Sequence, residues 1–284
     1  MEGQAAAPAA GTVLNALATG TGSAFAIDEY VTATVSLSEE PGVTGEIAGV
    51  EDADTRLVEQ CVERVVEEFG DRQGGTVRTE SDVPPAAGLK SSSAAANATV
   101  VATLSALDAA DAISREKAAR IGVQAARDVG VTVTGAFDDA SASMLGGVTV
   151  TDNERDELLA RETRDWDVLV WTPPERAYSA DADVERCRRV APVADFVADL
   201  ALDGDYERAM TINGFAFCGS LGFSAEPLVE GLAGAAGVSL SGTGPSFTAV
   251  GDRDSLAAVR ELWDQREGTV WLTRTQSEGT LIDD

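Results

Sequence analysis

The sequence predicts an α+β fold in which helices cover one face of a mainly antiparallel sheet. Short segments rich in β-branched residues alternate with longer segments that have helical apolar spacing. Several consecutive strand-like segments are joined by glycine-rich turns, which is typical of antiparallel pairing. At 284 residues with 44% hydrophobic content, the chain is long enough for one large or two ordinary domains.

The first half of the chain contains the longest helical patterns. Leu57, Cys61 and Val65 recur at helical spacing, and Gly70 ends that helix. Ser114 is placed to cap a later helix, and Pro8 to end the first strand. In order, we expect strands at 1–7, 11–18, 30–37 and 45–50, a helix at 54–69, a strand at 76–79, helices at 91–109 and 114–129, a strand from 131, and a Gly146-Gly147 turn into a strand at 148–151.

An acidic segment, 152–165, marks the expected junction between an N-terminal domain, 1–152, and a C-terminal domain, 153–284. Beyond the junction, alternating apolar runs predict strands and capped runs predict helices. We expect strands at 167–172, 238–241, 247–250 and 269–273, and helices at 182–189, 193–202, 206–217, 227–236 and 255–265.

The charge balance restricts the possible partners. Lys+Arg of 21 against Asp+Glu of 48 gives a formal charge of −27. A chain this acidic lacks the clustered cations that nucleic acid or an anionic membrane requires. Only two lysines occur, and acidic residues occur on nearly every predicted helix face, so the composition resembles that of a protein from a halophilic cytoplasm. At about 1 M salt the Debye length is roughly 3 Å, which screens the self-repulsion.

The cysteines and the absence of histidine exclude several kinds of site. Cys61, Cys187 and Cys218 show no paired spacing, so neither a zinc site nor a disulfide framework is expected. No Ser-His-Asp triad is possible without histidine. The sequence has no membrane-length apolar run and no charged signal-peptide start, which predicts a cytoplasmic protein.

The stretch DVPPAAGLKSSSAAANA, residues 82–98, has the features of a phosphate-binding loop that opens a helix. The prolines extend the entry, Gly88 permits a left-handed turn, and Ser91 to Ser93 supply capping hydroxyls beside free N–H groups. An anion fits at such a helix start, although an ordinary capped helix would need only the serines. The alanines that follow would let the helix approach a neighbouring backbone closely.

Lys90 and a pair of carboxylates complete a possible phosphoryl-transfer site. Lys90 would act as a point charge on phosphate, and Asp138 or Asp139 would accept or orient the proton of an attacking hydroxyl. The alternative for the aspartates is an Asx turn between strands. Neither GxxxxGK[ST] nor a GxGxxG in a βαβ unit is present, which excludes the P-loop and Rossmann solutions.

Three motifs in this order resemble those of the GHMP kinase superfamily: 84-PPAAGLKSSSAAANA-98, 134-TGAFDDAS-141 and 241-SGTGPS-246. Within it, GLKSSSAAANA with lysine in place of the usual second glycine, GAFDDA and NALATGTGSAFAID look most like the archaeal type of shikimate kinase. The resemblance implies a ribosomal S5 domain 2-like N-terminal half and a ferredoxin-like C-terminal half. It also implies ATP-dependent phosphorylation of the shikimate 3-hydroxyl, with Mg²⁺, in aromatic amino-acid biosynthesis.

The resemblance also assigns residues. Ser91 and Ser92 match the serines that meet phosphate and Mg²⁺, and Asp138 matches the catalytic aspartate. Several members of the superfamily carry a lysine in a further, N-terminal motif. The corresponding stretch here, 15–28, contains none, so Lys90 is expected to supply that charge. The expected nucleotide-binding residues are Pro85, Ala86, Ala87, Gly88, Leu89, Lys90, Ser91, Ser92, Ser93, Gly242 and Gly244.

Substrate and metal ligands are the least determined. Thr21, Gly22, Ser23 and Asp28 are the candidates for the substrate loop, although the glycines there would equally suit a tight turn. Asp128 is the candidate second metal ligand beside Ser92. Two alternatives stay open: another kinase of the superfamily, such as a homoserine or mevalonate kinase, and a non-catalytic nucleotide-binding regulator.

Overall fold

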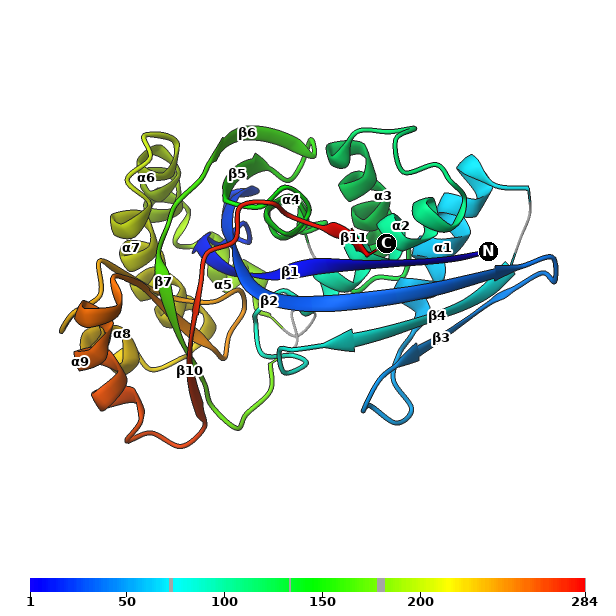
Figure 1. The fold of residues 1–284 in the computed structure, drawn as a ribbon. Helices are drawn as coiled ribbons and strands as arrows, with labels where there is room; N and C mark the ends of the chain where they lie inside the picture. The colour runs from blue at the N-terminus through cyan, green and yellow to red at the C-terminus, as the bar shows by residue number, and fades with distance from the viewer. Residues whose placement is uncertain (72–73, 133, 178–181, 284) are drawn as a thin grey trace.

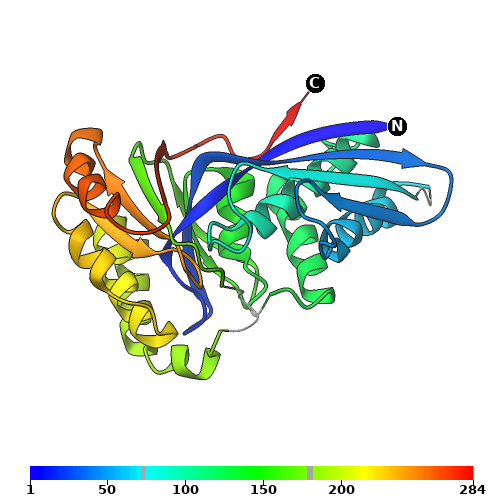
Figure 2. The same cartoon turned by 90° about the horizontal axis from the view of Figure 1, so that it is seen from below.

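The computed structural model describes residues 1–71, 74–132, 134–177 and 182–283, and its strands form two sheets. Within these residues the first sheet has seven strands, in the order β11-β1-β2-β4-β3, with β5 paired to β2 and β6 to β5. The second has four, in the order β10-β7-β9-β8. Figures 1 and 2 show the two sheets toward opposite ends of the molecule. The α+β prediction is confirmed.

The strands of the first sheet are β1 (Glu2–Leu14), β2 (Thr21–Ser38), β3 (Val43–Ile47), β4 (Gly74–Ser81), β5 (Val148–Asp152), β6 (Glu157–Glu162) and β11 (Leu281–Asp283). Those of the second are β7 (Asp167–Thr172), β8 (Gly237–Leu240), β9 (Phe247–Gly251) and β10 (Thr269–Arg274). The helices are α1 (Arg56–Phe69), α2 (Ser91–Ala106), α3 (Arg115–Asp128), α4 (Phe137–Leu145), α5 (Val184–Arg188), α6 (Ala191–Leu202), α7 (Tyr206–Leu221), α8 (Glu226–Gly231) and α9 (Arg253–Trp263).

The longest strands, β1 and β2, form the spine of the first sheet. They pair antiparallel along most of their length, from Glu2 opposite Ser36 to Leu14 opposite Ser23. The expected break at Pro8 is wrong, because β1 continues through it with a register shift between Pro8 and Ala10. Such a bulge is where a strand tolerates a residue that lacks an N–H donor.

Helices α1, α2 and α3 cover one face of this sheet (Figure 1). The alanine-rich α2 lies closest to the strands, and a β-carbon placed on Gly3 of β1 would sit 2.2 Å from the carbonyl oxygen of Ala102. The predicted close approach of this helix to a neighbouring backbone is therefore confirmed. The contact holds the C-terminal half of α2 directly against β1.

The strand β7 is buried on both faces, which explains its continuous apolar run DVLVWT. Val168 and Val170 belong to a core shared with the ends of β1 and β2, whereas Leu169 and Trp171 belong to a core with α7, α8 and α9. The strand thus separates two cores and connects the halves of the molecule.

Three elements were not expected from the sequence: α4, β6 and β11. The strand predicted from residue 131 is wrong, since residues 134–136 lead directly into the helix α4; Val133 lies outside the described residues. The division of the chain at residue 152 stays a prediction. Both β6 and β11 follow that residue yet pair within the first sheet, and β11 lies beside β1 (Figure 2).

None of the helices in the described part of the chain has the length and apolar character that crossing a membrane requires.

Candidate active site

The predicted phosphate loop lies between β4 and α2, and its backbone is sharply turned. Ala86, Gly88 and Lys90 all have positive φ, of 56°, 80° and 64°. Lys90, in the left-handed conformation, is the N-cap of α2, and its side chain makes no capping hydrogen bond among the described residues. The expectation that serine hydroxyls cap the helix is therefore wrong, because Ser91 to Ser93 form its first turn. The N–H groups of that turn point outward from the helix start, which is the usual geometry for binding an anion.

The glycine-rich loop at 241–246 packs directly on the phosphate loop. The Ser241 hydroxyl donates to the Gly88 carbonyl at 2.8 Å, and the Ser246 N–H donates to the Ala87 carbonyl at 3.2 Å. A β-carbon on Gly88 would lie 2.4 Å from the Ser241 carbonyl oxygen, so only glycine allows both this contact and the local φ. The two motifs, about 150 residues apart in the chain, form one continuous surface of backbone.

A network of buried polar side chains holds the glycine-rich loop in place. The Gly242 N–H donates to the Thr12 hydroxyl at 2.8 Å, and its carbonyl accepts from the Asn15 side-chain amide at 2.8 Å. The Asn15 N–H in turn donates to Oδ1 of Asn213 on α7 at 2.9 Å, and Asn213 Nδ2 donates to the Ser239 hydroxyl at 3.0 Å. The end of β1, helix α7 and this loop are thus fixed to one another.

The two aspartates lie in the first turn of α4 and face different partners. Asp139 forms an ion pair with Lys90, with Nζ 2.5 Å from Oδ1. Asp138 is buried, accepts from Asn153 Nδ2 at 2.6 Å, and packs so closely on β2 that a β-carbon on Gly22 would lie 2.5 Å from its Oδ2. The chain therefore brings a phosphate-loop lysine and two carboxylates to one place.

Electrostatics distinguish Asp139 from an ordinary carboxyl group. Burial, and then the negative charge of neighbouring Asp138, raise the pKa of Asp139 to about 7, against the opposing effect of the Lys90 ammonium. Lys90 and Asp139 expose only 9% and 14% of their side chains, so solvent screens their interaction little. A carboxyl group with a pKa near neutrality exchanges protons readily under physiological conditions.

The structure separates the four candidate substrate residues. Gly22 lies against Asp138, and Thr21 precedes it where β2 pairs with β5. Successive side chains of a strand point to opposite faces, so Ser23 projects away from the face that Gly22 presents to Asp138. Asp28 is about 20 Å further along β2, and its carboxylate accepts from Tyr30 at 2.9 Å and Arg274 at 2.9 Å. Asp28 is thus not brought to the aspartate pair.

The two proposed metal ligands are also separated. Ser92 lies in the first turn of α2, at the phosphate loop. The carboxylate of Asp128 has both oxygens engaged, one by an ion pair with Arg64 of α1 and the other by Gln124 at 3.0 Å. The hydrogen bond from Arg64 lowers the pKa of Asp128, so the two residues form a structural ion pair at the surface. Among the described residues no group of three His, Cys, Asp or Glu side chains could hold a metal ion.

Sequence reasoning missed the residues that support the site from behind. Asn15, Asn213 and Asn153 are all buried. Asn15 hydrogen bonds to the glycine-rich loop, Asn213 holds Asn15, and Asn153 hydrogen bonds to the start of α4. Asn15 and Asn153 each directly follow a strand, β1 and β5, where a short polar side chain often turns back on the backbone. The position after a strand could therefore have drawn attention to Asn15 and Asn153, but the sequence does not show which distant residues they contact.

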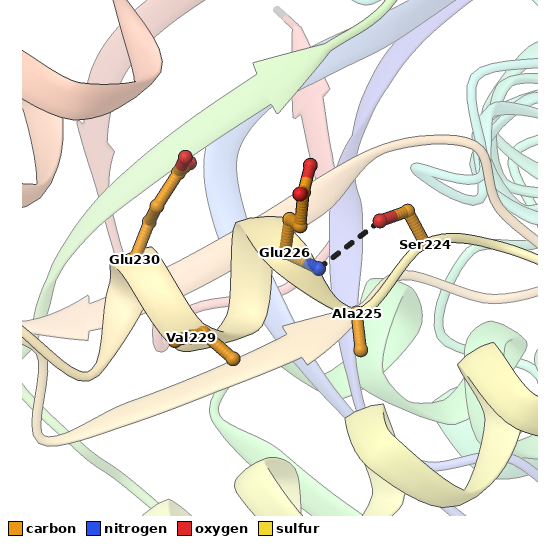
Figure 3. Close-up of a pocket in the computed structure, with 5 residues that line it drawn as sticks. All are labelled: Ser224, Ala225, Glu226, Val229 and Glu230. Carbon is orange, nitrogen blue, oxygen red and sulfur yellow. Dashed lines mark hydrogen bonds between the residues drawn. The ribbon is translucent and has the colours of Figure 1, made fainter.

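A hollow of about 440 Å³ lies elsewhere, on α8 (Figure 3). It is lined by Ser224, Ala225, Glu226, Val229 and Glu230, and the Ser224 hydroxyl accepts from the Glu226 N–H at 3.2 Å. It includes none of the residues predicted for nucleotide or substrate.

Comparison with known proteins points to the same region of the chain as the site. Residues 56–147, which include the phosphate loop and the aspartate pair, match the family model described as the GHMP kinases N terminal domain. The chain is 64% identical over 280 residues to a shikimate kinase of Halobacterium salinarum, covering 98% of this chain and 99% of that protein. It is 50% identical over 285 residues to a shikimate kinase of Methanosarcina mazei, covering 99% and 97%.

Solved structures of low sequence identity share the fold. A homoserine kinase from Cytophaga hutchinsonii superposes with a TM-score of 0.75 at 16% identity, covering 99% of this chain and 97% of that one. A mevalonate kinase from Methanococcus jannaschii does so with 0.77 at 13%, covering 96% and 98%. These two likenesses show the shared fold, the family model gives the superfamily, and the sequence relatives are far more similar and span nearly the whole chain. The chain belongs to the archaeal shikimate kinase family of the GHMP kinase superfamily.

Proposed function

We propose that this chain transfers the γ-phosphoryl group of ATP to the 3-hydroxyl of shikimate, giving 3-phosphoshikimate and ADP. The observation that carries the proposal is the Lys90–Asp139 ion pair, which joins the phosphate loop to the first turn of α4. The names of the full-length relatives supply the acceptor. The resulting step belongs to the biosynthesis of aromatic amino acids.

The nucleotide phosphates fit the surface formed by the two packed loops. The first-turn N–H groups of α2 and its dipole favour an anion, and the phosphate-loop residues 85–93 with Gly242 and Gly244 line the approach. A β-carbon on Gly242 would lie 3.2 Å from Lys90 Nζ, so a side chain there would crowd the ammonium. The small residues keep this surface open to phosphate oxygens.

The residues present also fit a magnesium ion bound largely through the nucleotide. Mg²⁺ usually keeps several waters and takes few protein ligands, so the Ser92 hydroxyl beside bound phosphates is a sufficient anchor. The ion would neutralise charge on the phosphates. Asp128 does not fit, since its oxygens are already occupied by Arg64 and Gln124.

Asp139 is the carboxylate best placed to receive the proton. The oxygen of the 3-hydroxyl attacks the γ-phosphorus, the bond to the β–γ bridging oxygen breaks, and ADP leaves with that electron pair. The hydroxyl proton passes to Asp139, whose pKa of about 7 suits a group that must both accept and release it. Lys90 stabilises the charge that develops on the transferred group.

The resemblance implies that Asp138 has this role, whereas the geometry favours its neighbour Asp139. Asp138 is 4% exposed, and its carboxylate is enclosed by Asn153 and by the backbone at Gly22. We place Gly22, which lies against Asp138, and the preceding Thr21 near the acceptor, and leave Ser23 and Asp28 out of contact with it.

A cytoplasmic location agrees with the cysteines. Cys61, Cys187 and Cys218 are free and buried in the structure, as is typical of proteins kept in a reducing compartment.

The test is ADP release from Mg-ATP in concentrated KCl with shikimate, homoserine or mevalonate as acceptor. We expect release with shikimate alone, and ³¹P NMR of the product should report a phosphate monoester on the 3-hydroxyl. Turnover of homoserine or mevalonate but not of shikimate would show that the acceptor is a different alcohol. ATP binding without release for any acceptor would favour a regulatory protein.

A further inference from the structure

Asn153, just after β5, has every polar group of its side chain in use. Its Oδ1 accepts from the Asp138 N–H at 3.0 Å and from the Thr151 hydroxyl at 2.8 Å. Its Nδ2 donates to Oδ1 of Asp138 at 2.6 Å and to the Thr134 hydroxyl at 3.4 Å. An asparagine amide offers two acceptor sites and two donors, so this one is fully satisfied while only 1% exposed.

The backbone of Asn153 is fixed as firmly as its side chain. Its N–H donates to the Gly20 carbonyl at 2.9 Å, and its carbonyl accepts from Arg127 at 3.1 Å. Arg127 also forms a two-pronged ion pair with Asp156, at 2.6 and 2.8 Å. One residue therefore joins the turn before β2, the loop before α4 and the end of β5.

The contact with Asp138 is double and directional. The amide presents its oxygen to the Asp138 N–H, which is one of the unpaired donors of the α4 start, and its nitrogen to the Asp138 carboxylate. With Gly22 packed on the other oxygen, the Asp138 side chain has one position. Its charge is thereby held beside Asp139, the next residue of the same turn.

Charged groups reach α4 from several elements, yet few act on Asp139. Asp138 and Lys90 are the charges whose influence on its carboxyl is resolved. From α3, Arg127 is paired with Asp156 and Arg120 lies over the Phe137 ring. From β6, Arg161 donates to the carbonyls at the far end of the helix. The position of Asp138 is thus a main determinant of the electrostatic environment of the Asp139 carboxyl group.

We infer that Asn153 is a positioning residue for phosphoryl transfer: it fixes Asp138 and, through it, the place and the charge environment of the Asp139 carboxyl. The inference rests on the proposed function for the role of Asp139 in turnover. The part of the inference that concerns how Asn153 fixes Asp138 is independent of the proposed function.

The experiment combines steady-state kinetics with titration of the aspartate carboxyls by ¹³C NMR, the Asp139 signal being identified by its loss in Asp139→Asn. For Asn153→Ala we expect kcat to fall about 10- to 100-fold, with the Kd of ATP little changed, as for a small displacement of a reacting group. With Asp138 no longer held beside it, Asp139 should titrate at lower pH, and the acid limb of the pH–rate profile should move with it.

Two further variants separate positioning from folding. Asn153→Asp keeps an oxygen to accept from the Asp138 N–H but sets a second buried carboxylate against Asp138 in place of the donor, so we expect kcat to stay low and the melting temperature to fall below that of wild type. Asn213→Ala removes another buried asparagine that touches neither aspartate, and it should leave the Asp139 titration unchanged.

An unshifted Asp139 titration in Asn153→Ala, or full recovery of kcat in Asn153→Asp, would overturn the inference and leave Asn153 as a helix cap. Failure of the proposed function would look different. Shikimate would then not be turned over by the wild-type protein, while the NMR titration would still depend on Asn153.

Discussion

Lys90 combines a backbone role and a charge role at one position. Its φ of 64° is a conformation that costs a non-glycine residue about 1–2 kcal/mol, and glycine is the usual residue at this point of the GHMP motif. The chain accepts that cost where the side chain can meet Asp139 in a site that excludes most water. We therefore expect Lys90 to supply the charge that a lysine of the N-terminal motif supplies in other members of the superfamily.

The variant Lys90→Gly isolates the charge, because glycine keeps the left-handed backbone. Lys90 lowers the pKa of Asp139, so without it the acid limb of the kcat profile should move to higher pH, and kcat at neutral pH should fall. Stopped assays across pH 5 to 9 would measure the shift of the acid limb. A shift of one pKa unit corresponds to about 1.4 kcal/mol. A limb that stays in place would mean that the ammonium does not act on Asp139.

The two aspartates should respond differently to the same substitution. We expect Asp139→Asn to lower kcat by about 10²- to 10⁴-fold, the usual loss for a general base, with ATP binding by calorimetry retained. Asp138→Asn removes the charge that raises the pKa of Asp139, so its acid limb should move to lower pH. A larger loss of kcat in Asp138→Asn than in Asp139→Asn would return the catalytic role to Asp138.

At the scale of elements, the site depends on helix starts held by distant segments. The loop that leads into α2 is held to β1 by the Ala10 N–H, which donates to the Leu89 carbonyl at 3.1 Å, and the start of α4 is held by Asn153. The glycine-rich loop has no helix of its own; it is held by Thr12, Asn15 and, through Asn15, by Asn213. The nucleotide surface is therefore only as rigid as this buried network.

Asn213→Ala tests the network from the α7 side. The Asn15 N–H loses its acceptor and the Ser239 hydroxyl loses one of its two partners, which should cost about 1–3 kcal/mol of stability. The loosened loop should raise the KM for ATP more than that for shikimate. Ser220→Ala is the matched control, a buried polar residue on the same helix that donates to the Phe217 carbonyl at 3.4 Å. Equal effects of both variants on the KM for ATP would contradict a specific role for Asn213.

At the scale of the whole molecule, the surface charge dominates the solution behaviour. Acidic residues outnumber basic ones by 48 to 21, so the ion pairs that the arginines form leave most of the acidic excess unpaired. Exposed pairs of this kind contribute little individually. The excess of negative charge opposes compaction, and salt screens this self-repulsion; the similar shikimate kinase, 64% identical, is from Halobacterium salinarum.

We therefore expect the protein to lose its far-UV circular dichroism signal and its cooperative melting when KCl is dialysed from molar concentration to below about 0.1 M. Sucrose in place of KCl is the control, since it favours compaction through exclusion without screening charge. A full signal and an unchanged melting temperature at low salt would show that screening is not required.

Much of the fold was readable from local patterns, because those patterns carry their own physics. The amphipathic α1, the Ser114 cap of α3 and the doubly buried β7 each follow from spacing and capping over a few residues. The fold class and the phosphate loop before α2 were likewise predictable. In each case the residues that decide the structure are neighbours in sequence.

Helix α4 shows where such local reading fails. The β-branched run from Val131 favoured a strand, and small residues hid the helical spacing of Phe137, Ala140 and Met144, whose burial against α2 and α3 decides the conformation. The choice of conformation came from packing, which outweighs weak local propensity.

The sequence by itself determined which chemical groups this protein has: a phosphate loop with a lone lysine, an aspartate pair and no histidine. Only the tertiary structure decided their roles. It paired Lys90 with Asp139, enclosed Asp138 between Asn153 and Gly22, and took Asp28 and Asp128 into arginine pairs elsewhere. The physical reason is that a side chain's protonation and reach depend on burial and on neighbours from distant segments, which no local pattern encodes.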